Sequence, residues 1–452
     1  MAAYSSVNNA AKRQKPAPAV REITPARSSG TSSEFQEFLP DVSRSEYRPE
    51  LDVDQSTNFK YYNASEKVHG RSLEEWIRPA ISFYHVINEY HSRGPQARRI
   101  FEDSTQNSLD GYKRRIRCVF ELGQKLGIKH YTAADSDFAP FGESLEDFHR
   151  GLDENINLVL ELQQKTGITP LWIKPNFETH LRFVSKFFIK IPLLFIHRGA
   201  QIKKALEIAQ KLGADNFLLD EIETLELFSV TDFSKNFRQH ARLLKLTAEF
   251  REHVGYRGQL LLLPNYSSQS EIPHQEAAFA SSALAFLKNY NLDRLYKLSV
   301  RSGYDFKVSL AYNLFGSLEI TKGRLPPELR EATLLMKTLI EHVRFQTGGL
   351  NIGLKSNPES DLKDVFVGYV TALDVYAKAL RVAAKLTADG IFTNGLQQRY
   401  SGFQTNFGAR FMNGELSLED LSEQAKRTTA ESPLPHGPNF WAAFYSRNSL
   451  NL

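Results

Sequence analysis

The sequence predicts an α/β fold of the (β/α)8 barrel type, followed by a helical C-terminal segment. Between about residue 56 and residue 374, short apolar runs alternate with stretches of helical periodicity, which is typical of βα units and a parallel sheet. Helix-start signals precede the periodic stretches, and glycines follow them. Eight of the apolar runs have the length of a strand, as eight repeated units require.

One repeat shows this pattern in full. The segment Ser144-Leu145-Glu146-Asp147 fits a capping box with Asp at the fourth place, and it predicts the start of a helix. Apolar residues at helical spacing then form one face of that helix, namely Leu145, Phe148, Leu152, Ile156 and Val159. Gly167 ends the helix, and residues 169–173 form a buried strand.

The following repeat obeys the same rules. Its helix carries Ile202, Leu206 and Ala209 on one face, ends at Gly213 and leads to a strand at residues 217–219. The remaining strand candidates are residues 81–84, 130–133, 260–263, 297–300, 315–318 and 350–354. In a barrel of this kind the chemistry takes place at the carboxyl ends of the strands.

Two segments lie outside the predicted barrel, which spans residues 56–374. Residues 1–55 are poor in aromatic and apolar residues, and they predict a disordered tail. Residues 1–33 hold five Lys or Arg and one acidic residue, which is also typical of a transit peptide, so mitochondrial or plastid targeting is the alternative to a cytoplasmic location. Residues 375–452 predict a helical arm, in which Ser417 opens a helix.

Composition and motifs exclude several classes of protein. The 452-residue chain has a net charge of +4 with both signs spread along it, which argues against a nucleic-acid partner or an anionic membrane. The most apolar stretch, residues 187–196, is too short to cross a membrane. Cys118 is the one cysteine, so an internal disulfide and a cysteine-built zinc site are excluded. The sequence has no Gly-rich phosphate loop and no His-Glu-x-x-His motif.

Four segments carry a more specific signal. They are Phe59-Lys60-Tyr61-Tyr62-Asn63, Asn313-Leu314-Phe315-Gly316-Ser317, Thr347-Gly348-Gly349-Leu350-Asn351 and Gln398-Arg399-Tyr400-Ser401-Gly402-Phe403. Together they resemble the D-xylose isomerase family, and the order of segments matches from about Phe59 to the C-terminus. The resemblance implies a TIM barrel with a C-terminal arm that embraces a neighbouring subunit. We therefore expect a homo-oligomer or a larger protein assembly.

The resemblance also shows where this chain departs from the family. Its members hold two divalent cations with carboxylates, the ligands that Mg²⁺ and Mn²⁺ prefer. Leu263, Arg301 and Gly353 stand at positions where the resemblance implies carboxylate ligands. Ala134 replaces the implied histidine that helps to open the sugar ring, and the Asp-x-Asp loop expected after Glu319 has no counterpart. We therefore expect no metal ion and no other cofactor.

Six residues remain as candidates for a site. Those for catalysis are Asp135, Asp137, His85 and Glu319, and those for a substrate pocket are Trp172 and Asn176. Each group also has a structural alternative. The two aspartates can cap a turn after a strand, His85 can be a hydrogen-bonded barrel residue, and Trp172 can belong to the core.

The leading hypothesis is a xylose isomerase-like pseudoenzyme that acts as a scaffold, interaction or regulatory subunit. One alternative is a divergent enzyme that uses the barrel pocket for a metal-independent isomerase or lyase reaction. Another is residual D-xylose/D-xylulose isomerase activity, and sugar binding stays an open question. The apolar segment Phe183–Ile196 replaces a Gly-, Ala- and Asn-rich loop of the family, and it predicts either an interface or a plug of the old pocket.

Overall fold

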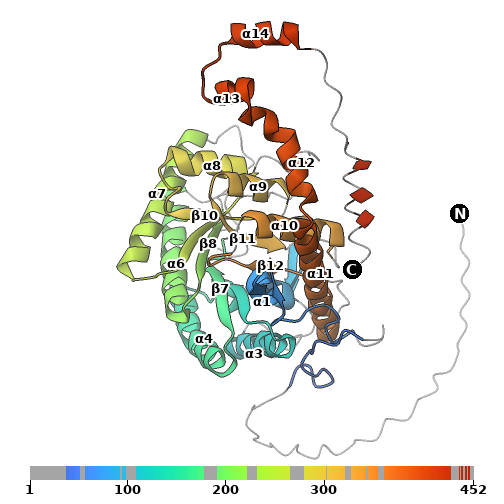
Figure 1. The fold of residues 1–452 in the computed structure, drawn as a ribbon. Helices are drawn as coiled ribbons and strands as arrows, with labels where there is room; N and C mark the ends of the chain where they lie inside the picture. Colours follow the sequence, from blue (N-terminus) through green and yellow to red (C-terminus); the bar gives the residue numbers. More distant parts are fainter. Residues whose placement is uncertain are drawn as a thin grey trace, which may run out of the picture. The chain divides into compact units, whose positions relative to one another are not determined.

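Eight parallel strands close into a barrel whose order follows the chain, β3-β6-β7-β8-β9-β10-β11-β12, with β12 paired to β3 (Figure 1). The strands are β3 (Pro79–Ser82), β6 (His130–Ala134), β7 (Thr169–Lys174), β8 (Asn216–Asp220), β9 (Gln259–Leu263), β10 (Tyr296–Val300), β11 (Phe315–Ile320) and β12 (Leu350–Ile352). The predicted (β/α)8 barrel is thus confirmed. Only the first strand lies two residues earlier than predicted, because helix α2 already begins at Phe83.

The structure describes residues 37–50, 56–91, 94–97, 108–177, 191–220, 232–264, 279–301, 303–320, 327–342, 345–354, 361–428, 437, 439–440, 443–444 and 446–447. Apart from Glu37, these residues belong to the unit Phe38–Leu452. Residues 1–36 and 51–55 of the predicted tail lie outside the described residues. Among the helices that are described, none is long and apolar enough to cross a membrane.

Helices surround the sheet as the capping signals predict. They are α1 (Leu73–Ile77), α2 (Phe83–Ile87), α3 (Leu109–Leu126), α4 (Leu145–Thr166), α6 (Ile191–Leu212), α7 (Phe233–His253), α8 (Phe279–Asn289), α9 (Tyr304–Ala311), α10 (Leu329–His342) and α11 (Leu362–Ala388). The Ser144 hydroxyl accepts a hydrogen bond from the Asp147 amide at 3.0 Å, and Gly167 ends α4 in the left-handed conformation. Two short antiparallel pairs complete the fold, β1 (Lys67–Val68) with β2 (Arg71–Ser72) and β4 (Asn88–His91) with β5 (Gly94–Ala97).

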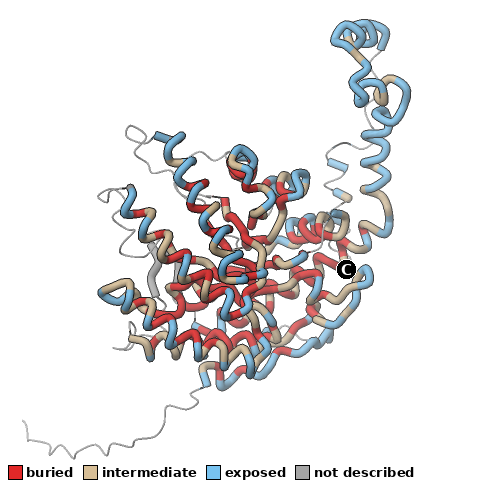
Figure 2. Tube along the Cα trace, turned by 90° about the vertical axis from the view of Figure 1, so that its left-hand side faces the viewer, coloured by how far each residue is buried: buried red, intermediate tan, exposed pale blue. Residues whose placement is uncertain are grey.

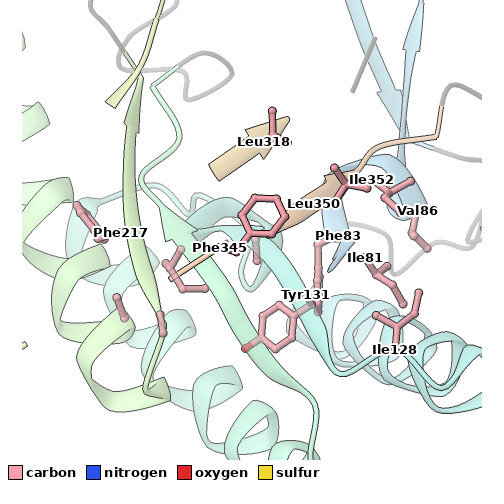
Figure 3. Close-up of a cluster of buried hydrophobic side chains, with 14 of the residues drawn as sticks. Ile81, Phe83, Val86, Ile128, Tyr131, Phe217, Leu318, Phe345, Leu350 and Ile352 are labelled. Carbon is pink, nitrogen blue, oxygen red and sulfur yellow. The ribbon is translucent and has the colours of Figure 1, made fainter. Parts of the chain in front are cut away.

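The core has two layers because successive strand residues face opposite sides of the sheet. The outer layer packs the strands against the helices, and Figure 3 shows part of it, with Ile81, Tyr131 and Phe217 from three different strands. The inner layer is a smaller cluster inside the barrel, formed by Ala80, Leu171, Trp172, Leu218 and Leu261. Each fully buried apolar side chain stabilises the fold by about 1.5–3 kcal/mol.

Several residues that match the motifs of the family are required by the close packing or the conformation of the barrel backbone. A Cβ atom at Gly348 would lie 1.9 Å from the Gly316 carbonyl oxygen, and one at Gly349 would lie 2.4 Å from the Arg78 carbonyl oxygen. Asn313 has a φ of 56°, a left-handed conformation that asparagine tolerates better than most residues. Packing of the barrel is therefore sufficient to explain why these residues match.

Residues 38–45, which the sequence analysis assigned to the disordered tail, pack against α3 instead, and residues 46–48 pair with Phe59. The two Glu121 carboxylate oxygens accept hydrogen bonds from the amides of Phe38 and Leu39, both at 2.9 Å. The Lys125 ammonium donates to the carbonyl oxygens of Leu39 and Val42. Leu39 and Val42 are buried. Paired contacts to the backbone order this stretch, and its own composition gave no sign of them.

The C-terminal part begins with α11, which runs across the predicted boundary at residues 374 and 375. Asp374, on this helix, accepts hydrogen bonds from the amides of Lys60, Tyr61 and Tyr62 at 2.8–2.9 Å. Three further helices follow, α12 (Ile391–Tyr400), α13 (Asn406–Met412) and α14 (Leu418–Arg427), and Ser417 caps α14 as predicted. None of the three contains a buried residue, and Figure 2 shows them almost entirely in the colour of exposed residues.

The close approach at Gly348 yields a test of the barrel packing. Gly348→Ala should lower the free energy of unfolding by at least about 2 kcal/mol, because the neighbouring atoms belong to the backbone and cannot move aside cheaply. Gly199→Ala is the matched control, since Gly199 lies within α6 and a Cβ there meets no atom within 4 Å. The control should keep or slightly raise stability. Urea unfolding measures both, and equal stability of the two variants would contradict the packing described.

Candidate functional site

The carboxyl ends of four neighbouring strands lie next to one another in register. Ala134 at the end of β6 pairs with Lys174 at the end of β7, and Asp220 at the end of β8 pairs with Leu263 at the end of β9. Leu263 occupies the position where the resemblance implied a bridging carboxylate. The strand ends therefore bring a lysine and an aspartate beside a position that has lost its ligand.

Asp135 is buried and its carboxylate is held by three donors. Its Oδ1 accepts hydrogen bonds from the Ser136 amide at 2.7 Å and the Asn176 amide at 2.9 Å. Its Oδ2 accepts from Gln201 Nε2 at 2.8 Å. The structure thus brings together Asp135 and Asn176, two of the predicted residues. Gln201, on α6, was missed, because nothing in its local sequence indicates that it faces the end of another strand.

Asp137 lies in the same short 3₁₀ helix, Asp135–Asp137, and caps its start. Its Oδ2 accepts a hydrogen bond from the Ala134 amide at 2.8 Å. Burial raises the pKa of Asp135 to about 7, against the opposing effect of its three hydrogen bonds. Burial also raises the pKa of Asp137 to about 6, although Lys174 and Arg115 favour its charged form. Asp137 makes the capping contact that the sequence analysis gave as the structural alternative, whereas Asp135 binds groups from its own turn, from the loop after β7 and from α6.

Glu319 is buried inside the barrel, and both of its oxygens are engaged. Its Oε1 accepts hydrogen bonds from Ser299 Oγ at 2.7 Å and Trp172 Nε1 at 3.2 Å. Its Oε2 accepts from Asn351 Nδ2 at 2.6 Å, and Asn351 in turn accepts from Thr132 Oγ1 at 2.8 Å. Burial raises the pKa of Glu319. Trp172 and Glu319, predicted separately, therefore meet in one network, while Ser299 and Thr132 were missed.

His85 lies on α2, directly after the first strand of the barrel. Its Nδ1 is 2.8 Å from Ser82 Oγ, as expected for a hydrogen-bonded barrel histidine. A Cβ atom at Gly353 would lie 2.5 Å from His85 Cε1. The imidazole therefore fills the space that a side chain at position 353 would need, and position 353 is where the resemblance implied an aspartate ligand.

Lys174 and Asp220 form an ion pair at the strand ends. Lys174 Nζ is 2.9 Å from Asp220 Oδ2 and 3.3 Å from Oδ1, and each side chain is 20% exposed. The sequence analysis did not single out either residue. A sheet register that joins two strands far apart in the sequence could not be read from local patterns.

These residues do not fit a pair of divalent cations. Leu263 offers no donor atom, Arg301 carries a positive charge, and Gly353 has no side chain. Glu319 already accepts from three side-chain donors. Across the described ranges, no group of three or more His, Cys, Asp or Glu residues could hold a metal ion.

The apolar segment Phe183–Ile196 is only partly described, because residues 178–190 lie outside the described residues. The sequence analysis predicted a loop for this segment, but its last six residues form the first turns of α6. Pro192 is tolerated there because the first amides of a helix need no hydrogen-bond partner within the helix. Leu194 is buried, while Leu193 and Ile196 are 47% and 65% exposed. This part of the segment therefore has one buried and one exposed face.

The buried Asp135 predicts a specific pH dependence of stability. Its folded pKa lies above its ordinary value, so its protonated form favours folding at low pH, and that contribution is lost as the pH rises from about 4 to about 7. The unfolding free energy of the wild type minus that of Asp135→Asn should fall over this window, by roughly 1.4 kcal/mol per pH unit at most. Urea unfolding across pH 4–8 measures it. A flat or rising difference for Asp135→Asn would contradict the prediction.

Comparison of the sequence with known proteins finds matches over most of the chain. The XylA2 C-terminal domain model matches residues 396–435. The chain is 30% identical over 391 residues to the xylose isomerase of Caldicellulosiruptor bescii, covering 81% of this chain and 89% of that protein. It is 28% identical over 390 residues to the xylose isomerase of Listeria welshimeri, with the same coverage of 81% and 89%.

Similar solved structures share less sequence with this chain. One is D-psicose 3-epimerase from Clostridium cellulolyticum, with a TM-score of 0.43, 14% identity and coverage of 67% of this chain and 99% of that one. Another is a xylose isomerase domain protein from Alicyclobacillus acidocaldarius, with a TM-score of 0.41, 12% identity and coverage of 66% and 99%. The sequence relatives, of whose length this chain covers 89%, show that the chain belongs to the xylose isomerase family.

Proposed function

We propose that this member of the family is a pseudoenzyme that serves as a scaffold, interaction or regulatory subunit. The observation that carries the proposal is the state of Glu319. Glu319 is 4% exposed, and its two oxygens accept hydrogen bonds from Trp172, Ser299 and Asn351. A carboxylate held in this way supports the inside of the barrel and has little remaining capacity to bind a cation.

The other replaced positions support the same proposal. Leucine at 263 removes the bridging ligand position, and arginine at 301 repels a cation at close range. At position 353 the His85 ring would have to move before any side chain could be accommodated. Restoring a metal site would therefore need several changes at once, including changes to residues that pack the barrel mouth.

The exposed arm supports an interaction role. Its apolar side chains include Phe403, Phe411, Met412 and Leu418, which are 47%, 45%, 66% and 80% exposed. Exposed apolar side chains that lie close together are typical of a surface that binds another protein. Barrel packing cannot explain the family match at residues 398–403, because no residue of α12 or of the following 3₁₀ turn is buried.

A second candidate function is a metal-independent isomerase or lyase reaction. The observation that favours it is Asp135, whose pKa of about 7 would suit a general base. Its three donors and its burial limit access to it. Turnover of an aldose or ketose that persists in chelator and is lost in Asp135→Asn would favour this candidate. Turnover of xylose that chelator abolishes would favour residual isomerase activity.

The first prediction from the proposal concerns metal and turnover. The purified protein should bind no pair of Mg²⁺, Mn²⁺ or Co²⁺ ions at micromolar concentration and should not convert xylose to xylulose. Isothermal titration calorimetry and a xylulose assay measure these properties, with the Caldicellulosiruptor bescii relative under identical conditions as the reference. Binding of two cations per chain with micromolar affinity, or metal-dependent turnover, would falsify the proposal.

The second prediction concerns assembly through the arm. The wild type should run in solution as a species larger than one chain, and Phe403→Ser with Phe411→Ser should reduce its mass, because these two rings lie 6.2 Å apart on an exposed surface. Tyr304→Ser on α9 is the control, since Tyr304 is 58% exposed but lies on the barrel. Light scattering after size exclusion gives the mass, and circular dichroism checks the fold. A monomeric wild type, or an unchanged mass in the double variant, would count against arm-mediated assembly.

A further inference from the structure

The mouth of the barrel still contains several acidic groups. Asp137 and Glu319 are 5% and 4% exposed, and Asp220 is the last residue of strand β8. Buried carboxylates are costly unless a positive charge or hydrogen-bond donors compensate them. The hydrogen-bond donors to Asp137 and Glu319 compensate part of this cost, and a positive charge beside the acids would compensate more of it.

The position of Lys174 allows its single positive charge to compensate these acidic side chains. It is the last residue of β7 and pairs in register with Ala134, which directly precedes the Asp135–Asp137 turn. Two residues earlier on the same strand, Trp172 faces the inside of the barrel and donates to Glu319. Because strand side chains alternate, Lys174 points to the same side as Trp172, one layer closer to the mouth.

The ammonium is fixed there by Asp220. Both Asp220 oxygens lie within 3.3 Å of Lys174 Nζ, and Asp220 is in register with Leu263, the replaced bridging position. Lysine suits this role because its charge is compact and sits on a flexible stem. Burial raises the pKa of both Asp137 and Glu319, and the positive charge of Lys174 opposes that rise.

We infer that the Lys174 ammonium is the built-in cation of the barrel mouth and takes the electrostatic place of a divalent ion. The inference goes beyond the proposed function, because it holds whether or not the barrel catalyses a reaction. It explains how the barrel keeps its acids after the ligand positions have been replaced. It also implies that a vacancy at Lys174 creates a site for an external cation beside Asp220.

Removal of the ammonium tests this inference in the full-length chain. Lys174→Ala should lower Tm by about 5 °C, as expected when a partly buried charge loses its partner. Millimolar MnCl₂, or propylammonium chloride, which replaces the missing side-chain atoms, should restore most of that loss. Potassium chloride at equal ionic strength should not restore it, and neither salt should shift the Tm of the wild type by as much.

Lys204→Ala is the matched control. The Lys204 side chain is 13% exposed and its Nζ lies 2.6 Å from Asp153, but this pair joins the outer helices α4 and α6. Its loss should be small and should not respond to Mn²⁺ or propylammonium. The double variant Lys174→Met with Asp220→Asn removes both charges and keeps the volume. It should be more stable than Lys174→Met alone and insensitive to Mn²⁺.

Three results would overturn the inference. One is a wild-type Tm in Lys174→Ala, and another is a loss that neither cation restores more than potassium does. The third is a double variant that is no more stable than Lys174→Met. This comparison tests the inference even if Lys174→Ala fails to fold. Failure of the proposed function would show separately, as metal-dependent turnover by the wild type.

Discussion

The pairing of the last strand with the first is the constraint on which the rest of the molecule depends. Leu350 on β12 is in register with Pro79 on β3, and the Leu350 amide donates to the Arg78 carbonyl at 3.1 Å. The two strands are separated by nearly the whole barrel in sequence, so closure requires every intervening unit to be in place. Gly349 makes it feasible, because a side chain there would meet the Arg78 carbonyl. Once closed, the sheet leaves no unpaired edge.

Closure also determines how polar side chains inside the barrel must behave. An inward polar group has little contact with water and needs a partner from another strand. Glu319, Ser299, Asn351 and Thr132 come from four strands and satisfy one another. The acids at the mouth are thus bound into the packing of the barrel. This dependence offers a physical reason why carboxylates persist in a barrel whose metal-ligand positions have been replaced.

Local rules predicted the ends of individual helices and strands, and the family resemblance gave the firmer support for a barrel of eight strands. Ser144 and Gly167 define the ends of α4 through contacts within a few residues, so the sequence predicts them directly. The stretch at residues 38–42 was assigned wrongly because its order comes from Glu121 and Lys125, more than 80 residues away. The same limit applies at the site. The sequence identified Glu319 and Trp172 as candidates, but their mutual contact depends on which strands are adjacent.

The site partners that were missed share this property. Gln201 reaches Asp135 across 66 residues of sequence, and Lys174 reaches Asp220 across 46. At Gly353 the sequence shows the loss of a side chain, whereas the filling of that space by His85 requires the closed barrel. Identity at one position can therefore reveal what a site has lost. What replaces the lost group becomes visible only in three dimensions.

The attachment of residues 38–42 to α3 has a mechanical consequence. The Glu121 carboxylate accepts hydrogen bonds from two backbone amides, and the Lys125 ammonium donates to two backbone carbonyls. Four hydrogen bonds therefore share any force applied to the N-terminal end of this unit. A pull on the preceding residues is transmitted to the outside of the barrel, at α3, and does not reach the first strand directly. A force applied upstream of residue 38 would therefore act first on a surface helix and only indirectly on the sheet.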